Sequence, residues 1–272
     1  MFRSILAAGL CLLMLAVFSP AMAGERQDIA ELQKLTGLDT LFDGLGEQWG
    51  TAGAADLKDD QVRTAWRRAA TEAFVADTMR QDAVAGLEGG MTEAERSALL
   101  AFYRTDFAGR LLSAENAAKG RESLVEDGKA VLASATPERL ALLRALAEAT
   151  GYEIAEQLFI DSLHTMMLAE VLAVANGQSP VPWDVINEKI DAQLKLIAPT
   201  MQKQIREVDE ATIAFTYREI TDEELKRYVD FLGTPPARRF YGIMVHGIAQ
   251  ATDHAMTRLG TNFVRNLLAV GI

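Results

Sequence analysis

Apolar residues recur every three or four positions along most of the chain and rarely alternate with polar ones. That spacing places them on one face of an α-helix, whereas a half-buried strand would show a period of two. The run that begins at Ile29, and another opened by Asp59 or Asp60, show the pattern. The sequence therefore predicts an all-α fold, in which tandem helical hairpins pack as an irregular helical bundle.

Two segments carry the same order of helix signals. One is "TEAERSALLAFYRTDFAGRLL", which begins at Thr92, and the other is "TDEELKRYVDFLGTPPARRFY", which begins at Thr221. In each, a glutamate follows the first threonine by three residues, which is the pattern of a capping box at a helix start. The helix that follows is expected to end near Tyr103 in one segment and at Leu232 in the other.

A second threonine in each segment predicts the start of a second helix. Thr105 and Thr234 occupy this position, and Pro235 suits the first position of a helix because no amide hydrogen is needed there. Gly233 precedes the turn, and we predict that it adopts the left-handed conformation that ends many helices. Both segments therefore predict a helix, a tight turn and a second helix.

The two segments belong to a longer internal repeat. Upstream, "LQKLTGLDTLFDGL" resembles "LAEATGYEIAEQLF" at an offset of 114, and the difference of 15 predicts an insertion near 175–184. Self-similarity of this kind indicates two copies, at about 28–120 and about 141–260. Within the hairpins, residues correspond at an offset of 129: Thr92, Phe102, Thr105, Ala108 and Arg110 match Thr221, Phe231, Thr234, Ala237 and Arg239.

The amino terminus has the three parts of a signal peptide. A basic start with Arg3 precedes an apolar stretch over 5–18, and Ala21-Met22-Ala23 forms a small-x-small cleavage site. We predict cleavage after Ala23 and a periplasmic or secreted mature protein. The apolar stretch is short for a membrane span, and no later stretch is long enough for one.

These signals divide the chain into three parts. Residues 1–23 are the signal peptide, residues 24–135 the first helical repeat with a connector helix, and residues 136–272 the second helical repeat. The connector is expected to extend the last helix of the first copy and to end before the cap at Thr136.

Composition excludes several classes of function. The only cysteine is Cys11, so the mature chain has no thiol nucleophile, zinc–thiolate site or disulfide. The formal charge is −11, and it becomes −12 when Arg3 is removed. An acidic chain repels phosphate backbones on average, so we expect no nucleic-acid partner.

The repeated hairpins resemble a known family. "MTEAERSALLAFYRTDFAGRLL" and "ITDEELKRYVDFLGTPPARRFY" are similar to the pattern of the family catalogued as domain of unknown function 2059, which runs Glu-Glu-Leu, Phe-Tyr, Ser-Pro-Ala-Gly and a basic residue. The first copy departs from it with Arg96 in place of leucine, and the second with Arg238 in place of glycine. The resemblance implies an exported helical envelope protein and assigns no catalytic residue.

Arginines near the second helix of each hairpin are the first candidate site. Arg110, Arg238 and Arg239 are expected in first turns, where a cation opposes the helix macrodipole at a cost of about 0.3–1 kcal/mol. One interpretation is an ion pair with an acid such as Glu93, Asp222 or Glu224. The other is an anion- or partner-binding site formed by the arginine and the helix start.

Histidines near the carboxyl terminus are the second candidate. His246 and His254 lie eight positions apart, on similar faces of one helix, and Asp253 is adjacent to the latter. These three residues are weak metal ligands on their own, because too few donors converge for the usual geometries. We therefore expect no metal, no cofactor and no catalytic residue.

The function that best fits these observations is a non-enzymatic binding or interaction module of the cell envelope. Broadly apolar helices favour an envelope protein or an apolar ligand as the partner. The alternative is an enzyme, or a small-ligand or metal-binding protein, that uses the starts at Arg110 and Arg239 or the face of His246, Asp253 and His254. The pattern leaves the oligomeric state open.

Overall fold

A computed structural model describes residues 20–55, 57–150, 160, 164, 167–168, 183–269 and 271. These residues are helical or lie in turns, and none of them forms a strand, which confirms the predicted all-α fold. Most of the predicted signal segment and of the predicted insertion at 175–184 lies outside the described residues.

The helices follow one another with short connections. Those before the connector are α1 (Pro20–Leu35), the 3-10 turn η1 (Leu38–Thr40), α2 (Leu45–Ala54), α3 (Asp60–Ala73), α4 (Ala76–Val84), the 3-10 turn η2 (Ala85–Leu87), α5 (Glu93–Tyr103) and α6 (Asp106–Ala118). Those after it are α7 (Leu124–Ser134), α8 (Pro137–Ala149), α10 (Trp183–Thr216), α11 (Asp222–Leu232) and α12 (Pro235–Ala269).

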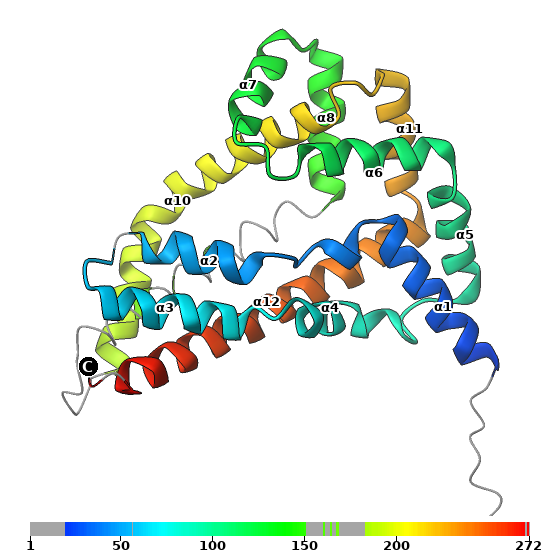
Figure 1. Cartoon of the computed structure of the whole chain (residues 1–272). Helices are drawn as coiled ribbons and strands as arrows, with labels where there is room; N and C mark the ends of the chain where they lie inside the picture. The colour runs from blue at the N-terminus through cyan, green and yellow to red at the C-terminus, as the bar shows by residue number, and fades with distance from the viewer. Residues whose placement is uncertain are drawn as a thin grey trace, which may run out of the picture.

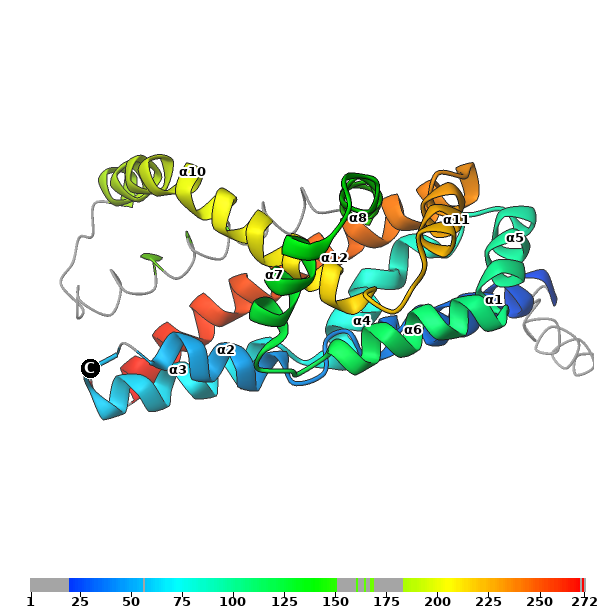
Figure 2. The same cartoon turned by 90° about the horizontal axis from the view of Figure 1, so that it is seen from above.

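The larger hydrophobic core is built around α12, the carboxyl-terminal helix. This helix runs alongside α3 and α4, and α2 packs against α3 (Figures 1 and 2). Phe240 and Phe263 of α12 are among the most completely buried side chains, and Phe263 meets Trp66 of α3 edge to face with ring centroids 5.2 Å apart. The last helix of the chain thus completes a core whose other helices come from the first half.

The smaller core joins α6, α8 and α11 to the end of α10. Phe107, Leu146 and Leu225 lie at its centre. α7 packs along α10 at the edge of this core (Figure 2). Both cores take helices from either side of residue 135, and the predicted division of the chain at 135/136 stays a prediction.

Two glycines allow helix backbones to touch. A Cβ atom on Gly247 of α12 would lie 2.8 Å from the carbonyl carbon of Ala83 in α4 and closer still to its oxygen. A Cβ atom on Gly128 of α7 would meet the backbone of Ala211 in α10 in the same way. Because real Cβ atoms do not approach backbone so closely, only glycine fits at these two crossings.

Most of the predicted helix starts are confirmed. Asp59 Oδ1 accepts hydrogen bonds from the amides of Gln61 and Val62, at 2.7 and 3.0 Å, and caps α3. Thr92 and Thr221 each form a complete capping box with the glutamate three residues later. These caps satisfy amide groups that the first turn of a helix leaves unpaired.

The predicted left-handed conformation of Gly233 is wrong. Its φ is −70° and ψ is −11°, because the turn stays right-handed and α12 begins two residues later. Arg104, the corresponding residue of the first hairpin, has nearly the same angles, φ −78° and ψ −4°. The turn therefore does not require glycine, and the two hairpins share its conformation.

The connector helix is not an extension of the first copy. α6 ends at Ala118, because the ψ of Lys119 is 132° and lies outside the helical range, and Gly120 continues the turn with a positive φ of 72°. A separate helix, α7, follows and packs against α10. The predicted cap at Thr136 is confirmed, since its hydroxyl accepts from the amide of Arg139 at 3.2 Å.

Candidate functional site

The two hairpins, α5–α6 and α11–α12, meet through corresponding positions. The ring of Phe102 stacks on that of Phe231, with centroids 3.5 Å apart and planes 5° apart. These residues are 129 positions apart, so each hairpin contributes the same position to the contact. We call this contact, together with the ion pairs that flank it, the hairpin junction. It has the self-complementary form of an interface between two identical subunits.

Two crossed ion pairs flank the stacked rings. Arg110 of the first hairpin pairs with Glu224 of the second. Arg239 of the second lies 3.9 Å from Glu95 of the first, and its Nε donates to the carbonyl of Gly90 at 2.7 Å. Both acids are the glutamates of the capping boxes, so each hairpin supplies a cation to the helix start of the other.

The predicted ion pair of Arg110 with Glu224 is confirmed, whereas Arg239 pairs with Glu95, which was not among the acids named. The position of both arginines differs from the prediction. Arg110 and Arg239 are the fifth residues of α6 and α12, one position beyond the first turn. Each pairs with an acid of the other hairpin, because the hairpins pack face to face. Both side chains are more than half exposed, so each pair is worth about 0–1 kcal/mol. Binding of an external anion at these residues stays a prediction.

Arg238 stands apart from the crossed pairs. Its side chain is exposed, and no ion pair joins it to another of the described residues. The corresponding position of the first hairpin is Gly109 in α6. Arg238 thus belongs to the second hairpin alone and has no counterpart at the junction.

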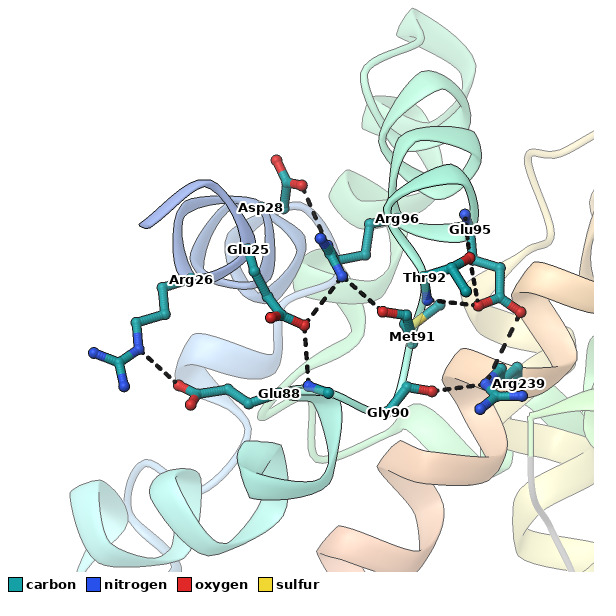
Figure 3. A network of polar contacts seen from close by, with 11 residues as sticks. Glu25, Arg26, Asp28, Glu88, Gly90, Met91, Thr92, Glu95, Arg96 and Arg239 are labelled. Atoms are coloured by element: carbon teal, nitrogen blue, oxygen red, sulfur yellow. Dashed lines mark hydrogen bonds and ion pairs between the residues drawn. The ribbon is translucent and has the colours of Figure 1, made fainter. Parts of the chain in front are cut away.

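Arg96, which departs from the family pattern, is the centre of a buried network (Figure 3). Its side chain is 8% exposed, and Nη1 donates to the carbonyl of Met91 at 2.7 Å and to Glu25 at 3.0 Å. Its Nε donates to Asp28 at 3.3 Å, and Glu25 also accepts from the amide of Gly89 at 3.0 Å. The arginine therefore ties α1 to the loop that leads into α5.

A different arginine fixes the loop that leads into α11, the first helix of the second hairpin. Arg139 of α8 donates to the carbonyl of Ile220 at 3.1 Å and to that of Tyr217 at 2.8 Å, and it pairs with Asp222. Met91 and Ile220 are 129 positions apart, so at both hairpins an arginine binds the carbonyl that precedes the capping threonine. The arginine comes from α5 at the first hairpin and from α8 at the second.

A cluster of tyrosines lies beside the stacked rings, and sequence reasoning missed it. The hydroxyl groups of Tyr103 and Tyr241 are 2.8 Å apart, and those of Tyr228 and Tyr241 are 3.4 Å apart. The hydroxyl of Tyr217 donates to Glu115 at 2.6 Å. We call these five residues the tyrosine–glutamate cluster. They come from four different helices and, in the case of Tyr217, from the turn that follows α10, so no motif in the sequence could reveal them.

Burial shifts the titration of this cluster. It raises the pKa values of Tyr103, Tyr217 and Tyr228 well above the ordinary range, so their hydroxyls are neutral. Burial also raises the pKa of Glu115, and this effect outweighs the hydrogen bond from Tyr217 and the charge of Lys119, which act in the opposite direction. Glu115 is therefore a carboxyl group of the tyrosine–glutamate cluster whose pKa lies above the ordinary range.

The histidine candidates do not converge on one site. His254 Nδ1 lies 3.1 Å from Asp82 of α4, whereas His246 and Asp253 are exposed. Eight positions of helix separate the two histidines by about 12 Å, too far to share one ion. Among the described residues, no group of three or more potential metal ligands comes together. Arg239 lies near the start of α12, and His254 lies 15 residues further along the same helix.

Comparison with known proteins identifies one likeness. Residues 77–138 match the model of a family described as "Uncharacterized protein conserved in bacteria (DUF2059)". The match covers α4, α5, α6 and α7 and so includes the first hairpin. No curated protein and no solved structure matches the chain.

The match agrees with the resemblance carried by the first hairpin. It is a single match, and it describes an uncharacterised bacterial family. In the part of the chain that the structure describes, no helix is both long enough and apolar enough to cross a membrane.

Proposed function

We propose that the chain is an exported, non-enzymatic interaction module of the bacterial envelope, built from two related copies of one helical unit. The signal peptide predicted at its amino terminus and the likeness of 77–138 to a bacterial family support this proposal. The second copy is proposed on the correspondence between the hairpins, which extends from sequence to contacts.

The observation that carries the proposal is that the arginines singled out above bind carboxylates and carbonyls of this same chain. The two arginines at corresponding positions, Arg110 and Arg239, both contact carboxylates of the opposite hairpin. Arg96 and Arg139 fix the loops before α5 and α11. Such contacts hold a rigid scaffold together and leave the protein's exposed surfaces to make contacts with a partner.

The long helix α10 provides one such surface. Leu196 is 76% exposed, and no residue from 195 to 210 is fully buried. α10 extends past the smaller core, which covers its carboxyl-terminal part through α7 and α8 (Figure 1). A helix that offers a large apolar side chain to solvent is a suitable position at which to look for a partner.

Export is tested by the mass of the protein recovered from the envelope of a bacterial host. We expect the mass of residues 24–272 in the periplasmic fraction. An Ala23→Phe variant is the control, because a large residue at the cleavage site blocks processing, and it should retain the full-length mass. Recovery of the full-length chain of the unaltered protein from the cytoplasm would refute export.

Interaction is tested on the exported protein by native mass spectrometry, combined with a photocrosslinking residue at position 196. We expect a bound species of defined mass and a crosslink that a probe at the exposed Glu122 does not give. A bare monomer without crosslinks from either position would overturn the interaction part of the proposal. A turnover activity of the purified chain would overturn the non-enzymatic part.

A further inference from the structure

Glu115 lies at a point where five segments of the fold meet. α6 carries the carboxyl group, and its hydrogen-bond partner, Tyr217, directly follows the end of α10. The other members of the tyrosine–glutamate cluster come from α5, α11 and α12. A change of charge at this one position therefore acts on both hairpins and on the end of α10.

The carboxyl group has few partners for a buried charge. One phenol hydroxyl, that of Tyr217, donates to it at 2.6 Å. Lys119, the residue that follows the end of α6, is the cation that acts on it among the described residues. Its ammonium group also donates to Thr40 at 3.2 Å. The remaining hydroxyls of the cluster, on Tyr103, Tyr228 and Tyr241, pair with one another.

We propose that Glu115 is a proton-operated latch between α6 and the turn that joins α10 to α11. The protonated carboxyl is neutral, and it still accepts the hydrogen bond from Tyr217, so it keeps the turn closed. The ionised carboxylate needs more donors or water than the site supplies, because an unsolvated charge is costly. Ionisation therefore loosens the contact until water reaches the carboxylate.

The direction of the pH dependence follows from proton linkage. Since burial raises the pKa of Glu115, the closed fold holds its proton at pH values where an unfolded chain, with a glutamate pKa of about 4.3, has already released it. The contribution of Glu115 to closure is thus complete in acid and is lost as the pH rises through the raised pKa. One proton changes the opening equilibrium by at most about tenfold per pH unit.

Hydrogen exchange tests the latch on the exported full chain. The quantity to measure is the protection factor of the amides of residues 213–220, at pH values from 4.5 to 8. A protection factor is used because it corrects the exchange rate for its intrinsic dependence on pH. We expect it to fall with rising pH and then level off, while that of α3 stays constant. A protection factor at 213–220 that is independent of pH would overturn the proposal.

Three variants separate the latch from a general effect of pH. Glu115→Gln imitates the neutral carboxyl and should hold the protection factor near its acid value at every pH. Glu122→Gln, at an exposed position, should reproduce the unaltered profile. Tyr217→Phe removes the hydrogen bond that holds the turn, so the protection factor should be lower even in acid. Because the hydroxyl also favours the carboxylate, its loss should move the fall to higher pH.

A fourth variant keeps the test decisive if Glu115→Gln does not fold. Lys119→Gln removes the nearby cation, and it should also move the fall in protection to higher pH, because the cation favours the ionised carboxylate. An unchanged profile in both Lys119→Gln and Tyr217→Phe would assign the pH dependence to another group and refute the role of Glu115.

Discussion

Replacement of Gly247 by alanine is the sharpest test of how α12 is packed. The added methyl group would lie 2.8 Å from the carbonyl carbon of Ala83 and 3.1 Å from its Cα, whereas ordinary contact begins at 3.4 Å. The obstacle is backbone of α4, which cannot rotate out of the way as a side chain can. α12 must therefore move away from α4, and this disturbs the larger core along the helix.

The expected cost has two opposing contributions. Overpacking of a close helix crossing costs about 1–3 kcal/mol. Alanine also favours the helix and recovers about 0.4–1 kcal/mol through the unfolded state. We expect Gly247→Ala to lower the free energy of unfolding by about 1–2 kcal/mol. Gly242→Ala, on the same helix, meets no atom within 4 Å and should raise it by about 0.4–1 kcal/mol.

Urea unfolding followed by far-ultraviolet circular dichroism measures both variants against the unaltered chain. The midpoints should move in opposite directions with an unchanged dependence on urea concentration, since the surface exposed on unfolding is the same. If Gly247→Ala were as stable as Gly242→Ala, α12 and α4 would not cross as closely as described, and the reasoning would be wrong.

Three further experiments test the loops and the hairpin junction by the same measurement. Arg96→Leu introduces the leucine of the pattern that the first hairpin resembles, but it leaves Glu25 without its cation. We expect the free energy of unfolding to fall by about 2–5 kcal/mol. An unchanged stability would contradict the buried network. Thr92→Ala removes a capping hydroxyl and should cost about 1 kcal/mol, while Thr92→Ser should cost much less. A double-mutant cycle of Arg110→Ala and Glu224→Ala should give a coupling free energy of about 0.2–1 kcal/mol, because the ion pair is exposed. A larger coupling free energy would mean that the ion pair is shielded from water.

The sequence was sufficient for the local structure of the hairpins. Capping boxes at Thr92 and Thr221 depend on residues three positions apart, and such signals act over one turn of helix. The failure at Gly233 has a local cause as well. A glycine at a helix end permits the left-handed conformation but does not impose it, and the early start of α12 kept the turn right-handed.

The contacts between hairpins could not be read from the sequence. The pairing of Arg110 with Glu224 and the clustering of Tyr217 with Glu115 both join residues more than a hundred positions apart. Periodicity shows which face of a helix is apolar, but it does not show which other helix covers that face. The tyrosines come from separate segments of the chain, so the partners of their hydroxyl groups stayed hidden until the helices were placed.

The hairpin junction has a consequence for the rate at which the chain folds. The contacts that close it span 114 positions between Arg110 and Glu224, 138 between Tyr103 and Tyr241, and 149 between Gly90 and Arg239. Such separations give a high contact order for a helical protein, and folding slows as contact order rises. During synthesis, the first hairpin must wait unpaired until residues near 240 have emerged from the ribosome.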